Sequence, residues 1–297
     1  MVRRHVVLAL ALCSLLVPRA ATAWSFELHR EITARAIAML PADIAPFFEA
    51  HRDYLTEHSI DPDLWRNAGF TDEPPRHYLD LDAYGEYPFA DLPRDFDEAV
   101  AKFGREKVIK YGTVPWRTAE MWERLVKAFA DHGEGTSPYA VENIKFFAAI
   151  VSHYAADANV PFHAVLNYDG QLTNQHGVHA RFESELYRRY RDRVSFAPER
   201  VPPVIAPRDH VFERLLEGTK LVEPILAADL DALGDGDLYD EAYFDRFFKA
   251  TQPILEQRLS SAVATVAVLI AGAWEAAGRP DLTRVPERPL QRKRSTP

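Results

Sequence analysis

The sequence contains almost no cysteine: among 297 residues there is one, Cys13. A single cysteine cannot form a disulfide within the chain, and it cannot build the Cys-rich cluster of a structural zinc site. The chain must therefore be held together by core burial, by metal ligands of other types, or by both. Residues 24–297 are long enough to bury one sizeable core.

The sequence also lacks an apolar run of the roughly 20 residues that a membrane-spanning helix needs. Its first apolar run, residues 6–17, follows Arg3 and Arg4 and precedes the small residues Ala-Thr-Ala at 21–23. This order is typical of a signal peptide that is cleaved after a small-residue site. We therefore predict a signal peptide over residues 1–23 and an exported protein, periplasmic or secreted, whose mature chain begins at Trp24.

A second apolar run covers residues 262–277 and is followed by a basic tail, an order that a membrane anchor would share. The run is short for a span, however, and Glu275 falls inside it. We interpret it as a C-terminal helix buried in the fold, with the anchor kept as the alternative.

Alternating patterns of β-strands are missing, whereas apolar residues recur at helical spacing in many segments. The sequence therefore predicts an all-α, single-domain helical bundle over residues 24–283, followed by a disordered basic tail over residues 284–297. Helices are expected over residues 28–40, 94–103, 115–131, 138–159, 178–194, 210–233 and 240–278.

Positive charge is in deficit, with 35 Lys and Arg against 44 Asp and Glu and a formal net charge of −9. Residues 1–23 contain three arginines and no acid, so their removal makes the chain more acidic still. Duplex DNA is bound mainly through Lys and Arg on phosphates, so duplex DNA is excluded as a partner. Small or single-stranded phosphate esters held by metal ions remain compatible with this charge.

Histidines and carboxylates, by contrast, are placed in pairs. His153 and Asp157 lie four residues apart on a predicted helix and thus share one face. Pro161 ends that helix, and His163 follows directly. His179 and Glu183 form a second pair at the same spacing, and His176 competes with His179 for a place in it. One such pair alone would be an ordinary buried ion pair, but two pairs together favour a metal site.

Further candidates precede these pairs. Trp24 is followed by His29 on the first helix, and residues 58–66 form a predicted loop that offers Asp61 and Asp63. Asp61 could equally cap a helix and His77 could equally be a turn residue. Asp61 and Asp63 compete for one ligand position, and an arginine, Arg66, follows Asp63 by three residues.

In this order the residues resemble the zinc-dependent phospholipase C superfamily, which includes the secreted single-strand-specific nucleases. The residues that carry the resemblance are Trp24, His29, Asp63, His77, His153, Asp157, His163, His179 and Glu183. The resemblance implies three zinc ions (Zn²⁺) as cofactors. It assigns them as follows: one on Asp63, His77, His153 and Asp157; one on the amino nitrogen and carbonyl oxygen of Trp24, His29 and Asp157; and one on His163, His179 and Glu183.

The resemblance also implies a hydrolase that cleaves phosphodiester bonds with a hydroxide bridging two metals. Asp63 and Arg66 would then be the catalytic residues, with the arginine gripping phosphate oxygens. The short sequence spacing between Trp24 and His29 and the Asp63–Arg66 pair favour the nuclease branch. Tyr78 and Asp80 also favour it, because they could bind a base.

Other features favour the phospholipase branch. Glu183 is the ligand that the phospholipases use, and the cysteines of the secreted nucleases are absent. Tyr78, Trp65 and Trp116 could form a cage for a choline headgroup. The substrate therefore stays open between a phospholipid headgroup, which implies transient contact with a membrane surface, and single-stranded nucleic acid. We expect a monomer.

The alternative from another class is an exported helical metal-binding protein without catalysis. A di-iron carboxylate bundle would use paired Glu-x2-His motifs, and none occurs among these residues. A catalytically inactive relative would be expected to lose Asp63 or Arg66, and both are present. We therefore predict an enzyme.

Overall fold

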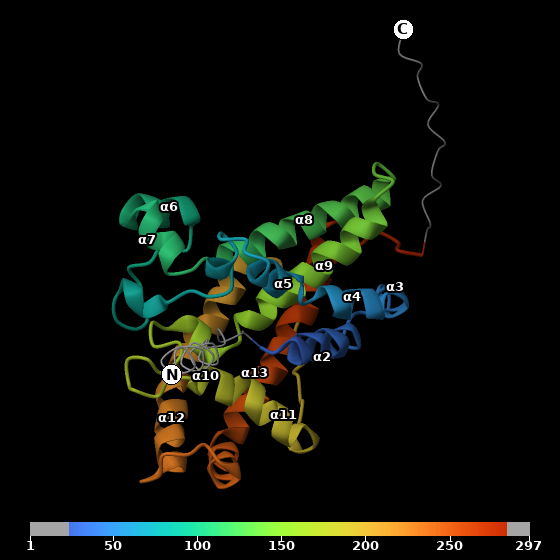
Figure 1. Cartoon of the computed structure of the whole chain (residues 1–297). Helices are drawn as coiled ribbons and strands as arrows, with labels where there is room; N and C mark the ends of the chain where they lie inside the picture. Colours follow the sequence, from blue (N-terminus) through green and yellow to red (C-terminus); the bar gives the residue numbers. More distant parts are fainter. Residues whose placement is uncertain (1–23, 284–297) are drawn as a thin grey trace, which may run out of the picture.

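The computed structural model describes residues 24–283. The long helices of this range form two pairs (Figure 1). No strand occurs within that range, so the all-α prediction is confirmed. The predicted signal peptide (1–23) and basic tail (284–297) lie outside the described residues. The α-helices are α2 (Phe26–Ile37), α3 (Ala45–Ala50), α4 (Arg52–His58), α5 (Asp61–Asn67), α6 (Phe96–Phe103), α7 (Arg105–Lys110), α8 (Val114–Glu134), α9 (Ala140–Asp157), α10 (Val178–Ala180), α11 (Leu186–Tyr190), α12 (Pro207–Leu233) and α13 (Glu241–Ala276). The shorter turns are η1 (Pro74–Arg76), η2 (Leu81–Tyr84), η3 (Pro161–Ala164), η4 (Arg181–Glu185) and η5 (Arg191–Arg193).

The helices α8 and α9 lie side by side as a hairpin (Figure 1). Gly135 ends α8 in the left-handed conformation, with φ of 66°, which glycine adopts without strain. The last ten residues of α9, 148–157, are all buried, because α2, α8 and α13 surround this end of the helix. Its alanines let these helices approach closely, so any polar side chain on its last turns is enclosed by protein.

The long helix α13 packs against α2, α8, α9 and α12. Its residues Leu259, Val263 and Val266 are fully buried, and Trp122 of α8 donates its indole N–H to the carbonyl of Leu269 over 2.8 Å. The helix is long and apolar enough to cross a membrane, but 78% of its most apolar window is buried within the protein. This burial supports the interpretation of residues 262–277 as a core helix.

The predicted loop over residues 58–66 is wrong, because most of it forms the two-turn helix α5. Pro62 stands in the first turn of this helix, where the missing N–H of proline has no partner to lose. The helical spacing brings Asp63 and Arg66 onto one face of α5. The short helices α3, α4 and α7 were likewise not predicted.

The predicted helix over residues 178–194 is interrupted. A π-helical turn, η4, separates α10 from α11, and the 3₁₀ turn η5 follows. Arg181, at the start of η4, donates to both carboxylate oxygens of Asp229 on α12, over 2.9 and 3.1 Å. This buried ion pair fastens the segment that bears His179 and Glu183 to the α12 side of the bundle.

Candidate metal centre

The carboxylate of Asp157, in the last turn of α9, lies among four imidazoles. Its Oδ2 is 2.9 Å from His77 Nδ1 and 3.2 Å from His153 Nε2. Its Oδ1 is 3.4 Å from His29 Nε2 and 4.0 Å from His163 Nδ1. Each carboxylate oxygen thus faces its own pair of histidines, an arrangement suited to a carboxylate that bridges two cations.

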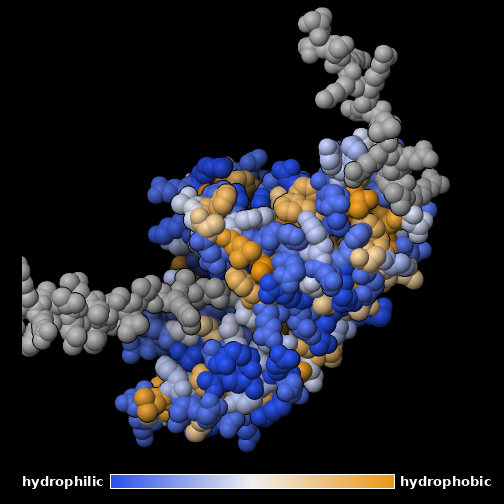
Figure 2. All heavy atoms as spheres, turned by 45° about the vertical axis from the view of Figure 1, so that its right-hand side comes forward, coloured by the Kyte–Doolittle hydropathy of each residue, from blue (hydrophilic) through white to orange (hydrophobic). Residues whose placement is uncertain are grey.

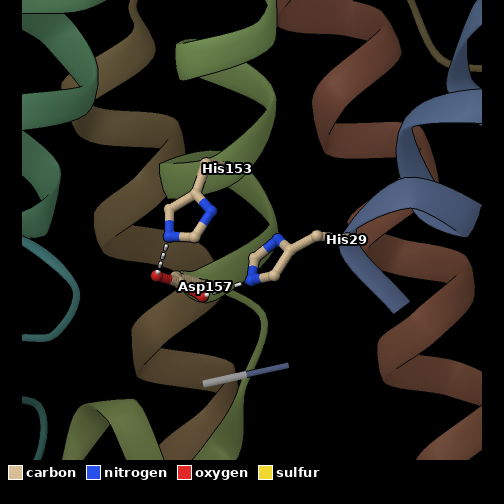
Figure 3. A group of neighbouring side chains, drawn as sticks. All are labelled: His29, His153 and Asp157. Carbon is tan, nitrogen blue, oxygen red and sulfur yellow. Dashed lines mark ion pairs between the residues drawn. The ribbon is translucent and has the colours of Figure 1, made fainter. Parts of the chain in front are cut away.

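Two helices deliver the first group, as Figure 3 shows. His153 and Asp157 project from the same face of α9, and His29 reaches toward them from α2. The rings of His29 and His153 stack with their centroids 4.1 Å apart. Ligand atoms of His29, His153 and Asp157 all lie within 4.8 Å of one another, close enough to share one metal ion.

A second group combines Asp63 of α5 and His77 with His153. His77 Nδ1 is 3.9 Å from Asp63 Oδ1 and 3.1 Å from His153 Nε2. Asp61 turns elsewhere and contacts His58, with 2.8 Å between Oδ2 and Nδ1. The geometry therefore places Asp63, and not Asp61, in the cluster.

The third group contains His163 of η3, His179 of α10 and Glu183 of η4. Glu183 Oε1 lies 2.6 Å from His179 Nε2, and the ring of His163 is 5.2 Å from that of His179. His176 is exposed, and its backbone carbonyl accepts a hydrogen bond of 2.8 Å from Arg181. The buried position belongs to His179.

Trp24 lies at the same end of α9. Its side chain is fully buried, and the indole N–H donates to the carbonyl of Ala156 over 3.0 Å. The next residue, Ser25, caps α2 by accepting a hydrogen bond from the Leu28 N–H. These contacts hold the start of the predicted mature chain beside Asp157.

Many polar atoms in these groups are buried without a hydrogen bond. They include both oxygens of Asp63 and of Glu183, Oδ1 of Asp157, and both ring nitrogens of His29 and of His179. Asp63 has one ion-pair contact to Arg66 and Glu183 has one to His179, but the remaining carboxylate oxygens have no donor in the described residues. Buried carboxylate oxygens without a donor are costly, so such a cluster calls for a cation. Imidazole nitrogens and carboxylate oxygens in sets of this size are ligands that suit zinc. The residues present therefore fit the metal that the sequence predicts.

Burial and charge move the pKa values of these groups in different directions. Burial lowers the pKa of His163 to about 3 and raises the pKa of Glu183 to about 7. Burial also disfavours ionised Asp157, but its neighbouring histidines hold the pKa of that carboxyl well below its usual range. For His77, burial lowers the pKa, but the neighbouring carboxylates of Asp157 and Glu73 outweigh it and raise the pKa to about 9.

The other predicted site residues flank the cluster. Arg66 Nη2 lies 2.8 Å from Asp63 Oδ1, and this nitrogen is buried without a hydrogen bond. Tyr78 donates its hydroxyl to the carbonyl of Lys110 over 3.2 Å. Asp80 is 6% exposed, its Oδ1 has no partner in the described structure, and burial together with the charge of Asp82 raises its pKa to about 8.

The sequence did not predict two residues that contact the histidines of the second group on the ring nitrogen facing away from Asp157. Ser59 accepts, through its carbonyl, a hydrogen bond of 2.8 Å from His153 Nδ1. Glu73 lies next to His77 and is 1% exposed. The position of Glu73, four residues before a histidine, was the available signal, but the prolines between them do not predict a helix.

Comparison with known proteins agrees with this geometry. A search of the curated proteins found no match. The family model for zinc-dependent phospholipase C matches residues 28–233, well over half of the chain. The match includes every histidine and carboxylate of the three groups, whereas Trp24 lies just before it. The chain therefore belongs to the zinc-dependent phospholipase C family.

Proposed function

We propose that the protein is a zinc-dependent hydrolase that cleaves phosphodiester bonds in the manner of a phospholipase C. The observation that carries the proposal is the buried carboxylate of Asp157, whose two oxygens each face two imidazoles. The family match supports zinc and the hydrolysis of phosphoric esters. The three side-chain groups would hold three zinc ions, with the amino nitrogen and carbonyl oxygen of Trp24 completing the ion on His29 and Asp157.

Zinc held there would act as a Lewis acid that activates water and neutralises charge on the phosphate. Arg66 supplies the complementary donor. Its Nη2 lies 2.8 Å from Asp63 Oδ1, and its side chain is 18% exposed. A planar guanidinium in this position can bind two phosphate oxygens and hold the phosphorus in line for attack.

A nuclease acting on single strands is the second candidate, favoured by the segment after His77. The Leu79 N–H donates to the carbonyl of His163 over 2.9 Å, so this segment runs along the third group. Burial and the charge of Asp82 raise the pKa of Asp80 to about 8, which favours a protonated carboxyl that can both donate and accept a hydrogen bond. Together with the ring of Tyr78 it could bind the edge and the face of an unpaired base.

For partners and location we propose an exported monomer that does not bind duplex DNA. Hydrophilic side chains predominate on the face in Figure 2, with separate hydrophobic patches between them. Exposed apolar residues of the described chain include Phe70, Tyr87 and Leu172, which are 51–70% exposed and would allow transient contact with a membrane surface.

The test is a turnover panel on zinc-loaded protein that begins at Trp24. The substrates are a chromogenic phosphorylcholine ester, phosphatidylcholine vesicles, single-stranded DNA and single-stranded RNA, with duplex DNA for comparison and chelator-treated protein as the blank. Hydrolysis of the choline esters alone supports the phospholipase, and hydrolysis of the single strands alone supports the nuclease. No turnover at full metal loading would favour the non-catalytic metal-binding protein.

A further inference from the structure

Glu73 is a buried carboxylate that the proposed zinc ligands do not include. It directly precedes η1, is 1% exposed, and lies one residue after the exposed Asp72. A buried carboxylate is costly unless cations or hydrogen-bond donors surround it. The partners that Glu73 contacts therefore indicate what it does.

Three side chains converge on Glu73. The hydroxyl of Tyr154, on α9, donates a short hydrogen bond to Oε1. Arg76 donates to Oε2 from Nη1 over 2.7 Å, so the carboxylate has a cation beside it and is kept ionised. His77 presents its Nε2 at 3.6 Å from Oε1.

The two ring nitrogens of His77 face opposite surroundings. Nδ1 is turned toward the ligand groups, 2.9 Å from Asp157 Oδ2 and 3.1 Å from His153 Nε2. Nε2 is buried and has no hydrogen-bond partner in the described chain, and Glu73 is the carboxylate next to it. An N–H on Nε2 directed at Glu73 leaves the lone pair on Nδ1, which is the nitrogen on the ligand side.

We propose that Glu73 is a positioning residue for zinc binding by His77. It accepts the Nε2–H of His77, selects the tautomer with a free Nδ1 lone pair, and makes that nitrogen a stronger donor to the metal. The inference rests on the proposed zinc site and adds to it a residue that touches no metal. The separation of 3.6 Å must shorten by about 0.5 Å to reach hydrogen-bond length, a shift within the reach of the two side chains. Arg76 and Tyr154 already hold the carboxylate of Glu73 in place.

The neighbouring ligand His153 is held in the same way. Its Nδ1 donates to the carbonyl of Ser59 over 2.8 Å, which leaves Nε2 facing Asp157 and His77. Each histidine of the second group thus has an acceptor next to the ring nitrogen that faces away from the other ligand residues. Tyr154 follows His153 on α9, so the turn of helix that presents one ligand also holds the carboxylate behind the other.

The chain offers a matched pair of substitutions. Glu73→Gln removes the charge and keeps the size. Asp72→Asn removes the other carboxylate that pairs with Arg76, over 2.7 Å, at a side chain 69% exposed and away from His77. We expect Glu73→Gln to weaken binding of one zinc by about 10–100-fold in competition with a chromophoric chelator, and Asp72→Asn to bind as wild type.

Two further measurements separate positioning from a merely structural role. Melting in excess EDTA compares the metal-free proteins, and a structural Glu73 would lower that melting temperature and leave zinc affinity unchanged. Nitrogen-15 NMR of the zinc-loaded wild type assigns the tautomer of His77 and requires no variant to fold. We expect a protonated Nε2 and a metal-shifted Nδ1.

A proton on Nδ1 of His77, or wild-type zinc affinity in Glu73→Gln, would overturn the role of Glu73 and leave the proposed hydrolase standing. Wild-type protein that binds no zinc would overturn both proposals. The charge-keeping variant Glu73→Asp should lie between wild type and Glu73→Gln in affinity. An Asp variant as weak as the Gln variant would argue against the contribution of charge.

Discussion

Arg66 Nη2 lies 2.8 Å from Asp63 Oδ1, one turn away on α5. The acid is fully buried among the predicted ligands, while the side chain of the arginine is 18% exposed. A proposed metal ligand and a proposed phosphate-binding residue are thereby joined on one short helix. The pair makes it possible to separate metal binding from turnover by substitution.

Arg66→Ala should keep its zinc and lose turnover. A lost donor to the developing charge on a transition state costs roughly 10²–10³-fold in kcat, and Arg66→Lys should recover only part of it because an ammonium cannot form the planar fork. Zinc content and kcat are measured together. Arg124→Ala, which breaks an exposed pair with Glu120 on α8, is the control and should match wild type. Wild-type kcat in Arg66→Ala would reduce this residue to a surface charge.

Asp157→Ala should be the most damaging single substitution. The carboxylate faces all four central imidazoles, so its removal should lower the zinc content and reduce turnover below detection. Glu142→Ala, at an exposed position of the same helix that pairs with Lys145, is the control for changes to α9. If Glu183→Ala abolished turnover while Asp157→Ala remained active, the bridging role would be wrong.

Cleavage of the chain before Trp24 should determine how many zinc ions the protein binds. The amino nitrogen of Trp24 can bind a metal only when it is free, and in the uncleaved precursor it is an amide. We expect residues 24–297 to hold one zinc more than either the precursor or a form with a Met left before Trp24, and to be far more active. Trp24→Phe should cost less, because backbone atoms are the proposed ligands. Equal zinc and equal turnover in all forms would exclude the N-terminal ligand.

Stability of the metal-free protein should fall as pH rises from 6.5 to 9. The pKa of His77 is raised from 6.5 to about 9 on folding, so its contribution is full below 6.5 and is lost as pH passes through 9. The shift corresponds to on the order of 3 kcal/mol. Glu183, whose pKa is raised from 4.5 to about 7, adds a loss of the same sign that ends near pH 7.

Melting temperatures in EDTA at pH 6.5, 7.5 and 9 measure this loss. His77→Asn should flatten the upper part of the profile. Zinc-saturated wild type should not show the loss, because the metal has already displaced the protons. A metal-free wild type that becomes more stable across this range would show that the charge on His77 does not support the fold.

How far the sequence predicts the fold depends on the length of each element. The long helices α8, α9, α12 and α13 were expected within a few residues of their ends, because each spans many turns of apolar periodicity. Helix α5 was missed, since two turns that begin with Asp-Pro-Asp carry turn residues and little periodicity. The π-turn η4 was missed because an inserted residue leaves no compositional mark.

For the site, helical spacing paired His153 with Asp157 and His179 with Glu183, and the structure places both pairs together. Spacing along one helix cannot show which residues approach from other segments. That His77 lies at Asp157, 80 residues further along the chain, follows from packing of the η1 turn against α8, the partner of α9 in the hairpin. The same packing brings Glu73 behind His77, a contact that no local pattern encodes.

Histidines from separate segments of the chain surround the carboxylate of Asp157, and this arrangement has a practical consequence for handling the protein. Residues 24–297 contain no cysteine, so a chain that begins at Trp24 has no disulfide for reducing agents to break. Competing ligands and competing ions are the agents that would open the cluster. Nickel and copper bind nitrogen and oxygen sites about as strongly as zinc or more so. A sample purified on nickel resin is therefore expected to contain nickel at sites that would otherwise bind zinc.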